Sequence, residues 1–533
     1  MMAEYKGYDV IIAGAGHNAL TCGAMLAKMG VKVILFERNA WIGGGAVTRE
    51  MTAPGFKNDT HSWGHLWIHS NPIFKILKPE LEEKWGLKYI YSDTGMIGGA
   101  FQDGTGLIIH RSLEKTCESF AKVSKKDAKR YREIYEYWKE IRDGFIRHWW
   151  NPPEPESMSV AALEQTQEGR LMLRTQLLSC KDFVEENFEN PYIRAFLLFF
   201  SLAPNIKPDQ ENLGNIFFIM IPHLHDYGES IAQGGSGELS HSLARMIEGY
   251  GGRIVPSAPV KKFIIKNGTV VGVQLENSTE VYANKAVVTA VDPKHTYLEM
   301  IDKGLLPEDV VKGAEHFRPG KIPCSNSYWA LHNHPILKCG PEVTHTGYWR
   351  CMGFVEDIVD HWSEIERGLV PTNPCINVDC ASMKDPTRAP AGKHTLIIYT
   401  FAPYKLRDGT DWDDIEKEWG DRLLNTFRKY AINMTDDNII ARYINTPKKI
   451  AIDNPCMLDG ANMGGEMAKY QMGIFRPFPG WCHYRGPFKN FYHVGPWNHP
   501  GGGVTGMGGI TAIEIMKDLK ILKKSPWAEW AED

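Results

Sequence analysis

A glycine-rich turn between two apolar segments near the start of the chain restricts the fold more than any other sequence feature. Val10–Ala13 is an apolar run typical of a buried parallel strand. Residues 14–19, which read GAGHNA, follow it and fit the pattern G-x-G-x-x-G/A. In such a turn Gly14 permits the tight bend, Gly16 lets backbone approach a pyrophosphate, and Ala19 lets the next helix pack on the strand. The sequence therefore predicts a Rossmann-type α/β fold that binds a dinucleotide.

An acidic residue after the next apolar run supports this prediction. Val31–Phe36 reads as a second strand, and Glu37 follows it, 23 residues after Gly14. A carboxylate at this distance accepts hydrogen bonds from ribose hydroxyls. A glycine turn in an ordinary α/β unit is the competing interpretation, and the order of strand, turn, helix, strand and acid argues against it.

Two more glycine runs extend the pattern. Residues 43–48, GGGAVT, come shortly after Arg38. A diglycine at this place brings a second stretch of backbone to the pyrophosphate in many flavoproteins, and NAD dehydrogenases usually lack it. Residues 499–504, HPGGGV, follow a predicted strand at Phe491–Val494 and precede a predicted helix that reaches about Leu519. Three consecutive glycines are costly for stability, so they indicate a ligand at the start of that helix.

Residues 14–50 and the HPGGGV run together resemble the phytoene-desaturase-like flavoproteins, a group related to the amine oxidases, and in particular their bacterial branch with GHN after the second glycine. The resemblance implies a Rossmann-type FAD-binding domain, interleaved with an α+β substrate-binding domain, and FAD that is bound non-covalently. It implies that residues 5–95, 226–300 and 484–525 form the FAD-binding domain. Residues 96–225 and 301–483 would then form the substrate-binding and helical domain.

The resemblance also implies which residues contact FAD. Val260 stands where the family has an adenine-contacting residue, although a valine in the interior of a strand is an open alternative for that position. Gly45 stands where many diglycine flavoproteins have arginine, so no arginine contact is expected there. The expected FAD-binding residues are Gly14, Gly16, His17, Asn18, Ala19, Glu37, Arg38, Gly43, Gly44, Gly45, Ala46, Val260, Gly495, Gly502, Gly503 and Val504.

The implied activity is a FAD-dependent dehydrogenase or desaturase reaction, in which hydride passes to flavin N5 from an apolar substrate of isoprenoid, terpenoid or alicyclic type, with water addition as an option. A redox-neutral isomerase or hydratase, and a flavoprotein subunit of a larger complex, are the alternatives. No second dinucleotide fingerprint is found, because Gln233–Gly237 follows no clear apolar strand and lacks a downstream acid. The expected electron acceptor is therefore a quinone, an electron-transfer protein or oxygen.

We expect a substrate cavity lined mainly by apolar and aromatic groups, with Trp63, His65, Tyr328 and Trp497 near the substrate face of the flavin. The candidate catalytic residues are His65, Tyr328 and Trp497. His65 is the candidate for proton handling, because imidazole titrates near neutral pH. Packing between domains is an open alternative for the whole segment Asn58–His69.

Three histidines have the spacing of metal ligands on one helix face. They are His61, His65 and His69, at i, i+4 and i+8. No carboxylate or cysteine accompanies them at ligand spacing, and the resembling family uses no metal at this place. We therefore expect no metal site.

Composition and charge exclude other classes of protein. The chain of 533 residues has a net charge of −4, which argues against nucleic-acid binding. Its ten cysteines include no CxxC pair, which favours reduced thiols and a cytoplasmic location. No leader is recognised before the first strand, and the apolar run Ile193–Leu202 is too short to span a bilayer. A buried helix is favoured for this run, while peripheral membrane contact and an oligomer stay open.

Overall fold

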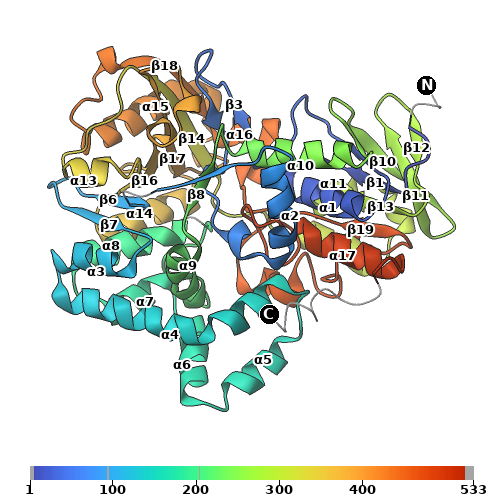
Figure 1. The fold of residues 1–533 in the computed structure, drawn as a ribbon, viewed down its shortest axis with the longest axis horizontal. Coiled ribbons are helices and arrows are strands. Elements are labelled where there is room, and N and C mark those ends of the chain that lie inside the picture. Colours follow the sequence, from blue (N-terminus) through green and yellow to red (C-terminus); the bar gives the residue numbers. More distant parts are fainter. Residues whose placement is uncertain (1–4, 93–94, 203, 523–533) are drawn as a thin grey trace.

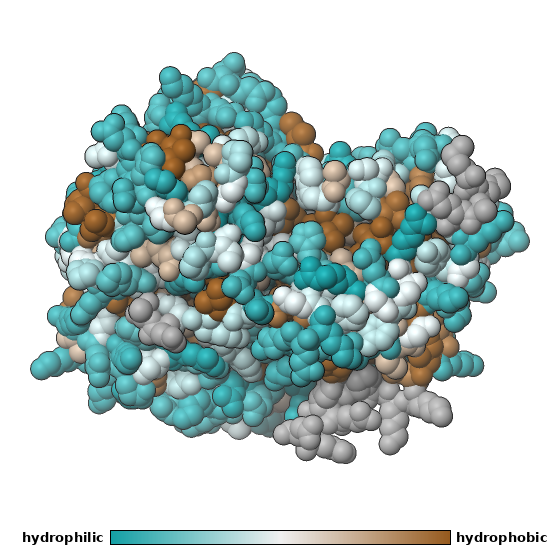
Figure 2. Space-filling view, turned by 45° about the horizontal axis from the view of Figure 1, so that its top comes forward, coloured by the Kyte–Doolittle hydropathy of each residue, from teal (hydrophilic) through white to brown (hydrophobic). Residues whose placement is uncertain are grey.

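The structure is a computed structural model that describes residues 5–92, 95–202 and 204–522. Residues 93–94 and 523–525 of the predicted FAD-binding domain, and residue 203 of the predicted substrate-binding domain, lie outside the described residues. Figure 1 shows one lobe around a parallel sheet, a second lobe around a mainly antiparallel sheet, and a group of helices below the second lobe. On one face, a hollow that exposes hydrophobic residues separates the two lobes (Figure 2).

A five-stranded parallel sheet forms the centre of the first lobe, in the order β19-β13-β1-β2-β9. Side chains of β1 alternate between two hydrophobic clusters, with Val10 and Ile12 in one and Ile11 and Ala13 in the other. Because both sides of the strand are buried, the whole strand is apolar. Helices α1, α10 and α17 pack on the first side, and the sheet β10-β11-β12 contributes to the cluster on the second. These elements are β1 (Val10–Ala13), α1 (His17–Lys28), β2 (Val33–Phe36), α10 (Gly237–Gly249), β9 (Arg253–Val255), β10 (Val260–Lys266), β11 (Thr269–Leu275), β12 (Glu280–Tyr282), β13 (Ala286–Thr289), β19 (Phe491–His493) and α17 (Gly508–Asp518).

A seven-stranded sheet forms the second lobe, in the order β18-β14-β17-β16-β15-β6-β7. Its pairs are antiparallel, except that β15 pairs with β6 in parallel. On one side, Trp329 and Trp349 pack in a cluster with α15; on the other, Tyr348 and Tyr399 join the core that contains α8 and α9. The elements are β6 (Ile97–Ala100), β7 (Gly106–Ile109), β14 (Cys324–Leu331), β15 (Tyr348–Cys351), β16 (Ile376–Asp379), β17 (His394–Phe401), α15 (Trp412–Arg428) and β18 (Ile439–Asn445).

The helical group contains the apolar run that is too short to span a membrane. Residues Ile193–Leu202 form the end of α8 and a short 3-10 turn, and all of them except Arg194 are buried. The prediction of a buried helix is confirmed. No helix of the described residues has the length and the apolar character needed to cross a bilayer. The group comprises α3 (Leu113–Ala121), α4 (Lys125–Trp150), α5 (Glu156–Leu163), α6 (Gln167–Leu177), α7 (Cys180–Asn187), α8 (Pro191–Leu198) and α9 (Gly214–Tyr227).

The remaining elements connect these parts. They are β3 (Thr48–Arg49), β4 (Asn58–Asp59), α2 (Pro72–Glu83), β5 (Tyr89–Tyr91), β8 (Ser230–Ala232), α11 (Pro293–Leu298), α12 (Glu308–His316), α13 (Pro341–Thr344), α14 (Val355–Glu366) and α16 (Pro447–Asp453).

The predicted fold class is confirmed, since an α/β first lobe with a Rossmann-type β1-α1-β2 unit stands beside an α+β second lobe. The domain boundaries stay a prediction. One element differs from the expectation, because the last helix starts at Gly508 and not directly after Val504. Gly503 and Gly506 have φ angles of +94° and +69°, which no right-handed helix contains. The chain therefore turns at Gly503 and again at Gly506 before the helix begins.

Candidate active site

Two adjoining cavities lie close to the carboxyl ends of the parallel strands. The first, of about 560 Å³, is lined by the ends of β1 and β2, the start of α1 and the loop after β19. Open α/β sheets bind their ligands at this edge. The second, of about 180 Å³, is lined by residues of the second sheet and of the helical group. The residues that line both cavities, here called the shared wall, are His17, Gly45, His61, Met457, Asn462 and Gly503.

The two glycine turns lie against each other in the first cavity. Gly16 and Gly43 form a parallel β-bridge, and a Cβ added to Gly44 would lie only 3.1 Å from the Cα of Gly16. Gly14 has a φ of +103°, a conformation that other residues rarely adopt. Helix α1 begins at His17 without a side-chain cap, so the positive end of its dipole faces the cavity. This arrangement can hold an anionic pyrophosphate.

Glu37 lies at the end of β2 and lines the same cavity. Its Oε2 accepts a hydrogen bond from the N–H of Ala15 at 2.8 Å, and its Oε1 accepts one from the N–H of Asn39 at 2.9 Å. Burial raises the pKa of Glu37, while these hydrogen bonds and the charge of Arg38 act in the opposite direction. Each oxygen keeps a free lone pair, so the oriented carboxylate can accept hydroxyl groups of a ribose.

His17 links the two ends of the chain at the shared wall. Its Nδ1 lies 3.3 Å from the carbonyl oxygen of Gly43, and its Nε2 lies 3.3 Å from that of Gly503. Burial lowers the pKa of His17, although both carbonyl groups raise it. A neutral imidazole carries one N–H, so it donates to one of the two carbonyls at a time.

Buried polar atoms of the first cavity are left without partners. Both amide atoms of Asn18 and the indole Nε1 of Trp497 have no hydrogen-bond partner within the described part of the chain. Such atoms are rare in a native protein unless a ligand or water pairs with them. The two adjacent glycine turns, here called the glycine cradle, the Glu37 carboxylate and these unpaired atoms together fit the binding of FAD.

Most of the expected FAD-binding residues line the first cavity. They are Gly14, Gly16, His17, Asn18, Ala19, Glu37, Arg38, Gly44, Gly45, Val260, Gly495 and Gly503.

The other four expected residues do not line the first cavity. Gly43 and Ala46 lie behind the cradle, where the Ala46 side chain is fully buried. A Cβ added to Gly502 would lie 2.6 Å from the Cα of Met463, so Gly502 packs against backbone instead of lining a cavity. Val504 lines the second cavity only.

An arginine that the sequence analysis missed also lines the first cavity. The Arg49 guanidinium carbon lies 4.0 Å from the centre of the Trp41 ring, and its Nη1 lies 3.1 Å from Oδ2 of Asp453. All three residues line the cavity. Arg49 therefore brings to the cavity the positive charge that Gly45 lacks. In the sequence an arginine was sought only at position 45, and the arginine four residues later was not considered.

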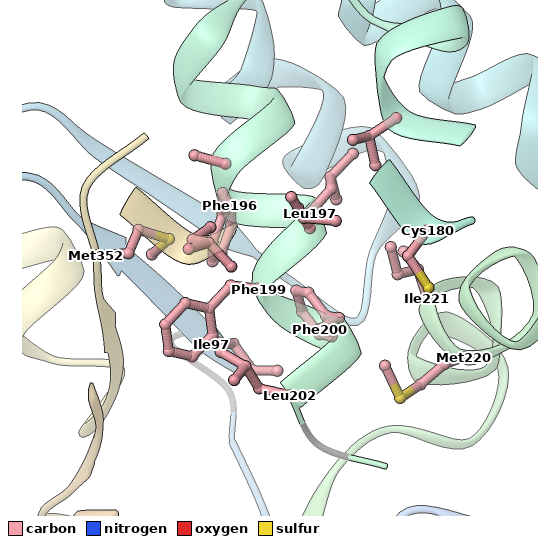
Figure 3. Close-up of a cluster of buried hydrophobic side chains, with 14 of the residues drawn as sticks. Ile97, Cys180, Phe196, Leu197, Phe199, Phe200, Leu202, Met220, Ile221 and Met352 are labelled. Atoms are coloured by element: carbon pink, nitrogen blue, oxygen red, sulfur yellow. The ribbon is translucent and has the colours of Figure 1, made fainter. Parts of the chain in front are cut away.

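The second cavity has an apolar side, to which Phe200 and Met220 contribute. Figure 3 shows both within a buried hydrophobic cluster drawn from the helical group and the edge of the second sheet. Trp63 lines the cavity as well, and its ring centroid lies 5.3 Å from those of Tyr348 and Tyr399. The expected aromatic lining is therefore present here.

The same cavity also has a charged side, formed by residues that the sequence analysis did not identify. Glu229, Arg350 and Asn377 line it, and none of them lines the first cavity. Arg350 and Asn377 are register partners on β15 and β16, and Glu229 precedes β8. Their proximity depends on strand pairing between distant segments, which no local sequence pattern records.

The structure does not place His65 at either cavity. Its Nδ1 lies 2.9 Å from the hydroxyl of Tyr89, and its Nε2 lies 2.8 Å from the hydroxyl of Ser236. Burial, assisted by the neighbouring His69, lowers the pKa of His65 to about 3. Because both nitrogens contact protein hydroxyls and His65 lines neither cavity, the structure argues against proton handling by His65.

The other two candidate catalytic residues are also relocated. The Tyr328 side chain is fully buried, lines neither cavity, and donates a hydrogen bond to the carbonyl of Thr60 at 2.6 Å. Tyr328 is thus a positioning residue for the segment that carries Thr60, which itself lines the first cavity. Trp497 lines the first cavity and not the second, so it lies on the cofactor side.

The three spaced histidines have different surroundings in the structure. No group of metal-ligating side chains is found among the residues that the structure describes. His69 contacts the hydroxyl of Ser230, whereas His61 belongs to the shared wall. Burial, with the nearby charge of Arg49, lowers the pKa of His61 to about 4. His61 and His17 are thus the two histidines that line both cavities.

Comparisons with known proteins agree with this geometry. The model of the family "Flavin containing amine oxidoreductase" matches residues 20–423. One of the subunits of limonene dehydrogenase from Castellaniella defragrans is 29% identical, over 97% of this chain and 95% of that protein. Diapophytoene desaturase of Methylomonas is 23% identical, over 94% of this chain and 93% of that protein.

Solved structures share the fold at low sequence identity. An oxidoreductase from Methanosarcina mazei superimposes with a TM-score of 0.62 at 16% identity, and covers 95% of this chain and 99% of its own. A putrescine oxidase variant gives a TM-score of 0.60 at 14% identity, over 96% of this chain and 99% of its own.

Proposed function

Because the chain belongs to the family of flavin containing amine oxidoreductases, we propose that this FAD-dependent oxidoreductase is a dehydrogenase or desaturase of a largely apolar molecule of isoprenoid, terpenoid or alicyclic type. The names of two relatives, one a component of limonene dehydrogenase and the other a diapophytoene desaturase, support this substrate class. The reaction is removal of hydride from an activated C–H bond, with water addition as an option.

The observation that carries the proposal is the shared wall. A cofactor in the first cavity and a substrate in the second would meet at His17, His61 and Gly503, which line both. Bound FAD supplies a hydride acceptor, its N5 atom, and the protein supplies the position and the exclusion of water. The apolar side of the second cavity would hold the hydrocarbon part of the substrate by burial.

The residues of the first cavity would each hold one part of FAD. Gly16 and Gly44 would take the pyrophosphate with the start of α1, and Glu37 would take the ribose. Val260 would meet the adenine, and Arg49 would add positive charge to the cradle.

We propose that FAD is bound without a covalent link. Cys456 lines the first cavity, but burial raises the pKa of its thiol, so it stays protonated and a poor nucleophile. The two ring nitrogens of His17 face backbone carbonyls. Release of all flavin on acid precipitation would support this arrangement, and flavin that stays with the protein would contradict it.

Electrons would leave to a quinone, an electron-transfer protein or oxygen. A dedicated nicotinamide domain is not proposed, because the sequence has one dinucleotide fingerprint. The relative in limonene dehydrogenase is named as a subunit, which supports assembly of this chain with a partner chain. The division into interleaved FAD-binding and substrate-binding domains, the cytoplasmic location, peripheral membrane contact and the oligomer stay predictions.

Anaerobic mixing of the purified yellow protein with isoprenoid and alicyclic hydrocarbons tests the proposal. Loss of the visible flavin absorbance on mixing, with a product that lacks two hydrogens or carries a new hydroxyl, is the expected result. Turnover that requires reduced FAD without net electron transfer would favour a redox-neutral isomerase, an activity named in a relative from Daucus carota. Loss of FAD unless a second chain is added would favour a component of a larger complex.

A further inference from the structure

The side chains on the charged side of the second cavity are held in place by strand pairing and ring stacking. Arg350 projects from β15 on the sheet face that carries Tyr348 and Tyr399, and its register partners are Asn377 on β16 and Gly99 on β6. The guanidinium carbon lies 3.4 Å from the centre of the Phe200 ring. Stacking on this ring fixes the guanidinium at the edge of the cavity.

Two buried nitrogens of Arg350 have no hydrogen-bond partner. The residue is 3% exposed, and neither Nε nor Nη1 has an acceptor within the described part of the chain. No carboxylate forms a salt bridge with it among those residues. The Tyr348 hydroxyl and the Glu229 carboxylate interact favourably with the guanidinium. The two buried nitrogens without acceptors still cost free energy, and a ligand oxygen would offset that cost.

Unused acceptors lie on the same side of the cavity. Oδ1 of Asn377 is buried and has no partner within the described residues, and the residue is 5% exposed. The Glu229 carboxylate also lines the cavity, and burial raises its pKa while the charges of Arg350 and Lys384 oppose that shift. A Cβ added to Gly64 would lie 2.1 Å from Oε1 of Glu229, so the glycine makes room for this carboxylate.

We propose that Arg350, Glu229 and Asn377 form a polar subsite for a hydroxyl group of the substrate. The substrate is then an alcohol, with a hydroxyl in the polar subsite and a hydrocarbon body toward the shared wall. This inference rests on the proposed function, because it assigns the second cavity to the substrate. It narrows the substrate class from apolar molecules in general to those with an apolar body and a hydroxyl away from the reacting carbon.

A hydroxyl is the group that matches the subsite. It accepts a hydrogen bond from Arg350 and donates one to Glu229 or Asn377, so it satisfies a donor and an acceptor at once. A hydrocarbon would leave the Arg350 donor and the acceptors of Glu229 and Asn377 without hydrogen-bond partners. A carboxylate would pair with Arg350, but it has no proton to donate and would place a second negative charge beside Glu229.

Binding to the oxidised holoenzyme tests the polar subsite without turnover. Geraniol, its hydrocarbon analogue that lacks the hydroxyl, and geranic acid share one skeleton. Their binding is measured by calorimetry and by the change in flavin absorbance under anaerobic conditions. Geraniol is expected to bind at least about 10-fold tighter than each of the other two. Equal affinities for the three compounds, or a preference for geranic acid, would overturn the assignment of a hydroxyl.

Variants test whether Arg350 causes the preference for geraniol. In Arg350→Met the preference for geraniol over its hydrocarbon analogue is expected to fall to about 2-fold or less, and Arg350→Lys is expected to restore part of it. Arg442→Met is the control, because Arg442 lies against Trp329 on the opposite side of the same sheet. A preference that survives Arg350→Met in a protein that still binds FAD would overturn the subsite. The comparison of ligands on the unchanged protein holds even if this variant fails to fold.

The inference and the proposed function can fail separately. If hydrocarbons bleach the flavin but geraniol binds no better than its analogue, the proposed function stands and the polar subsite is wrong. If geraniol binds selectively through Arg350 but no isoprenoid reduces the flavin, the subsite stands and the dehydrogenase proposal is wrong.

Discussion

The imidazole Nε2 of His17 lies 3.3 Å from the carbonyl oxygen of Gly503, although 486 residues separate the two in the chain. His17 is the first residue of α1, directly after the turn that follows β1, and Gly503 belongs to the glycine run after β19. These strands flank β13 in the parallel sheet, so the sheet brings the two ends of the chain to one edge. The site is therefore complete only when both ends have folded together.

Glu37→Ala is expected to weaken FAD binding by about 10- to 100-fold, because a ribose would lose hydrogen bonds to a charged group. Stability of the protein without FAD should fall by about 1–3 kcal/mol, since the N–H groups of Ala15 and Asn39 lose their acceptor. Calorimetric titration with FAD and urea denaturation measure the two effects. Glu280→Ala, at an exposed position of β12, is the control. Unchanged FAD affinity would count against the ribose contact.

Gly503→Val is expected to lower kcat by about 100-fold, because a displaced backbone would misplace groups at the shared wall. Its φ of +94° is strained for valine, so some stability is lost as well. Gly340→Val is the matched control: Gly340 has a φ of +99° and no atoms within 4 Å of an added Cβ. If the two variants lose the same stability and only Gly503→Val loses activity, the loss of activity comes from the changed active site and not from backbone strain. Normal turnover with bound FAD would separate this glycine from the reaction.

Arg49→Met is expected to weaken FAD binding by about 10-fold, since a charge-assisted contact would be lost at the cradle. The affinity of the unchanged protein should fall more steeply with added salt than that of the variant. Arg422→Met, whose arginine pairs with Glu418 on the far lobe, provides the control. Equal salt dependence in all three proteins would show that Arg49 does not act on the cofactor.

The buried histidines predict that the protein loses stability in mild acid. Burial lowers the pKa of His61 to about 4 and that of His65 to about 3, whereas histidine in an unfolded chain titrates near 6.5. Below that pH the unfolded state binds more protons, so the free energy of unfolding falls as the pH falls. Each buried ring contributes up to about 1.4 kcal/mol per pH unit.

His65→Gln tests this assignment. Glutamine does not titrate, so the variant should lose less stability than the unchanged protein between about pH 6.5 and pH 5 in urea denaturation. Its rate of flavin reduction should match the unchanged protein at each pH. His241→Gln, at an exposed position of α10, is the control. A changed pH profile of flavin reduction would return His65 to the reaction.

Local patterns were sufficient to predict the nucleotide-binding part of the fold. The turn at Gly14, the acid at Glu37 and the run around Gly503 each derive their meaning from neighbours in sequence, and each lines the first cavity. Residue type alone suggested His65 for proton handling, and it does not reveal that the hydroxyls of Tyr89 and Ser236 engage its ring.

The polar side of the second cavity could not be predicted in the same way. Arg350 and Asn377 meet through the pairing of β15 with β16, and Glu229 reaches them from a distant segment. In the sequence each is one polar residue in or beside a short strand. The strand order of the second sheet makes Arg350 and Asn377 neighbours, and the segment before β8 brings Glu229 to the same cavity.

A crystal structure of the yellow holoenzyme tests the central claim most directly. Electron density for FAD is expected with the pyrophosphate against the backbone of Gly16 and Gly44, the ribose at Glu37, and the flavin ring at the shared wall beside His17 and Gly503. Density that places the flavin ring away from this wall, or a nicotinamide dinucleotide in the first cavity, would contradict the account.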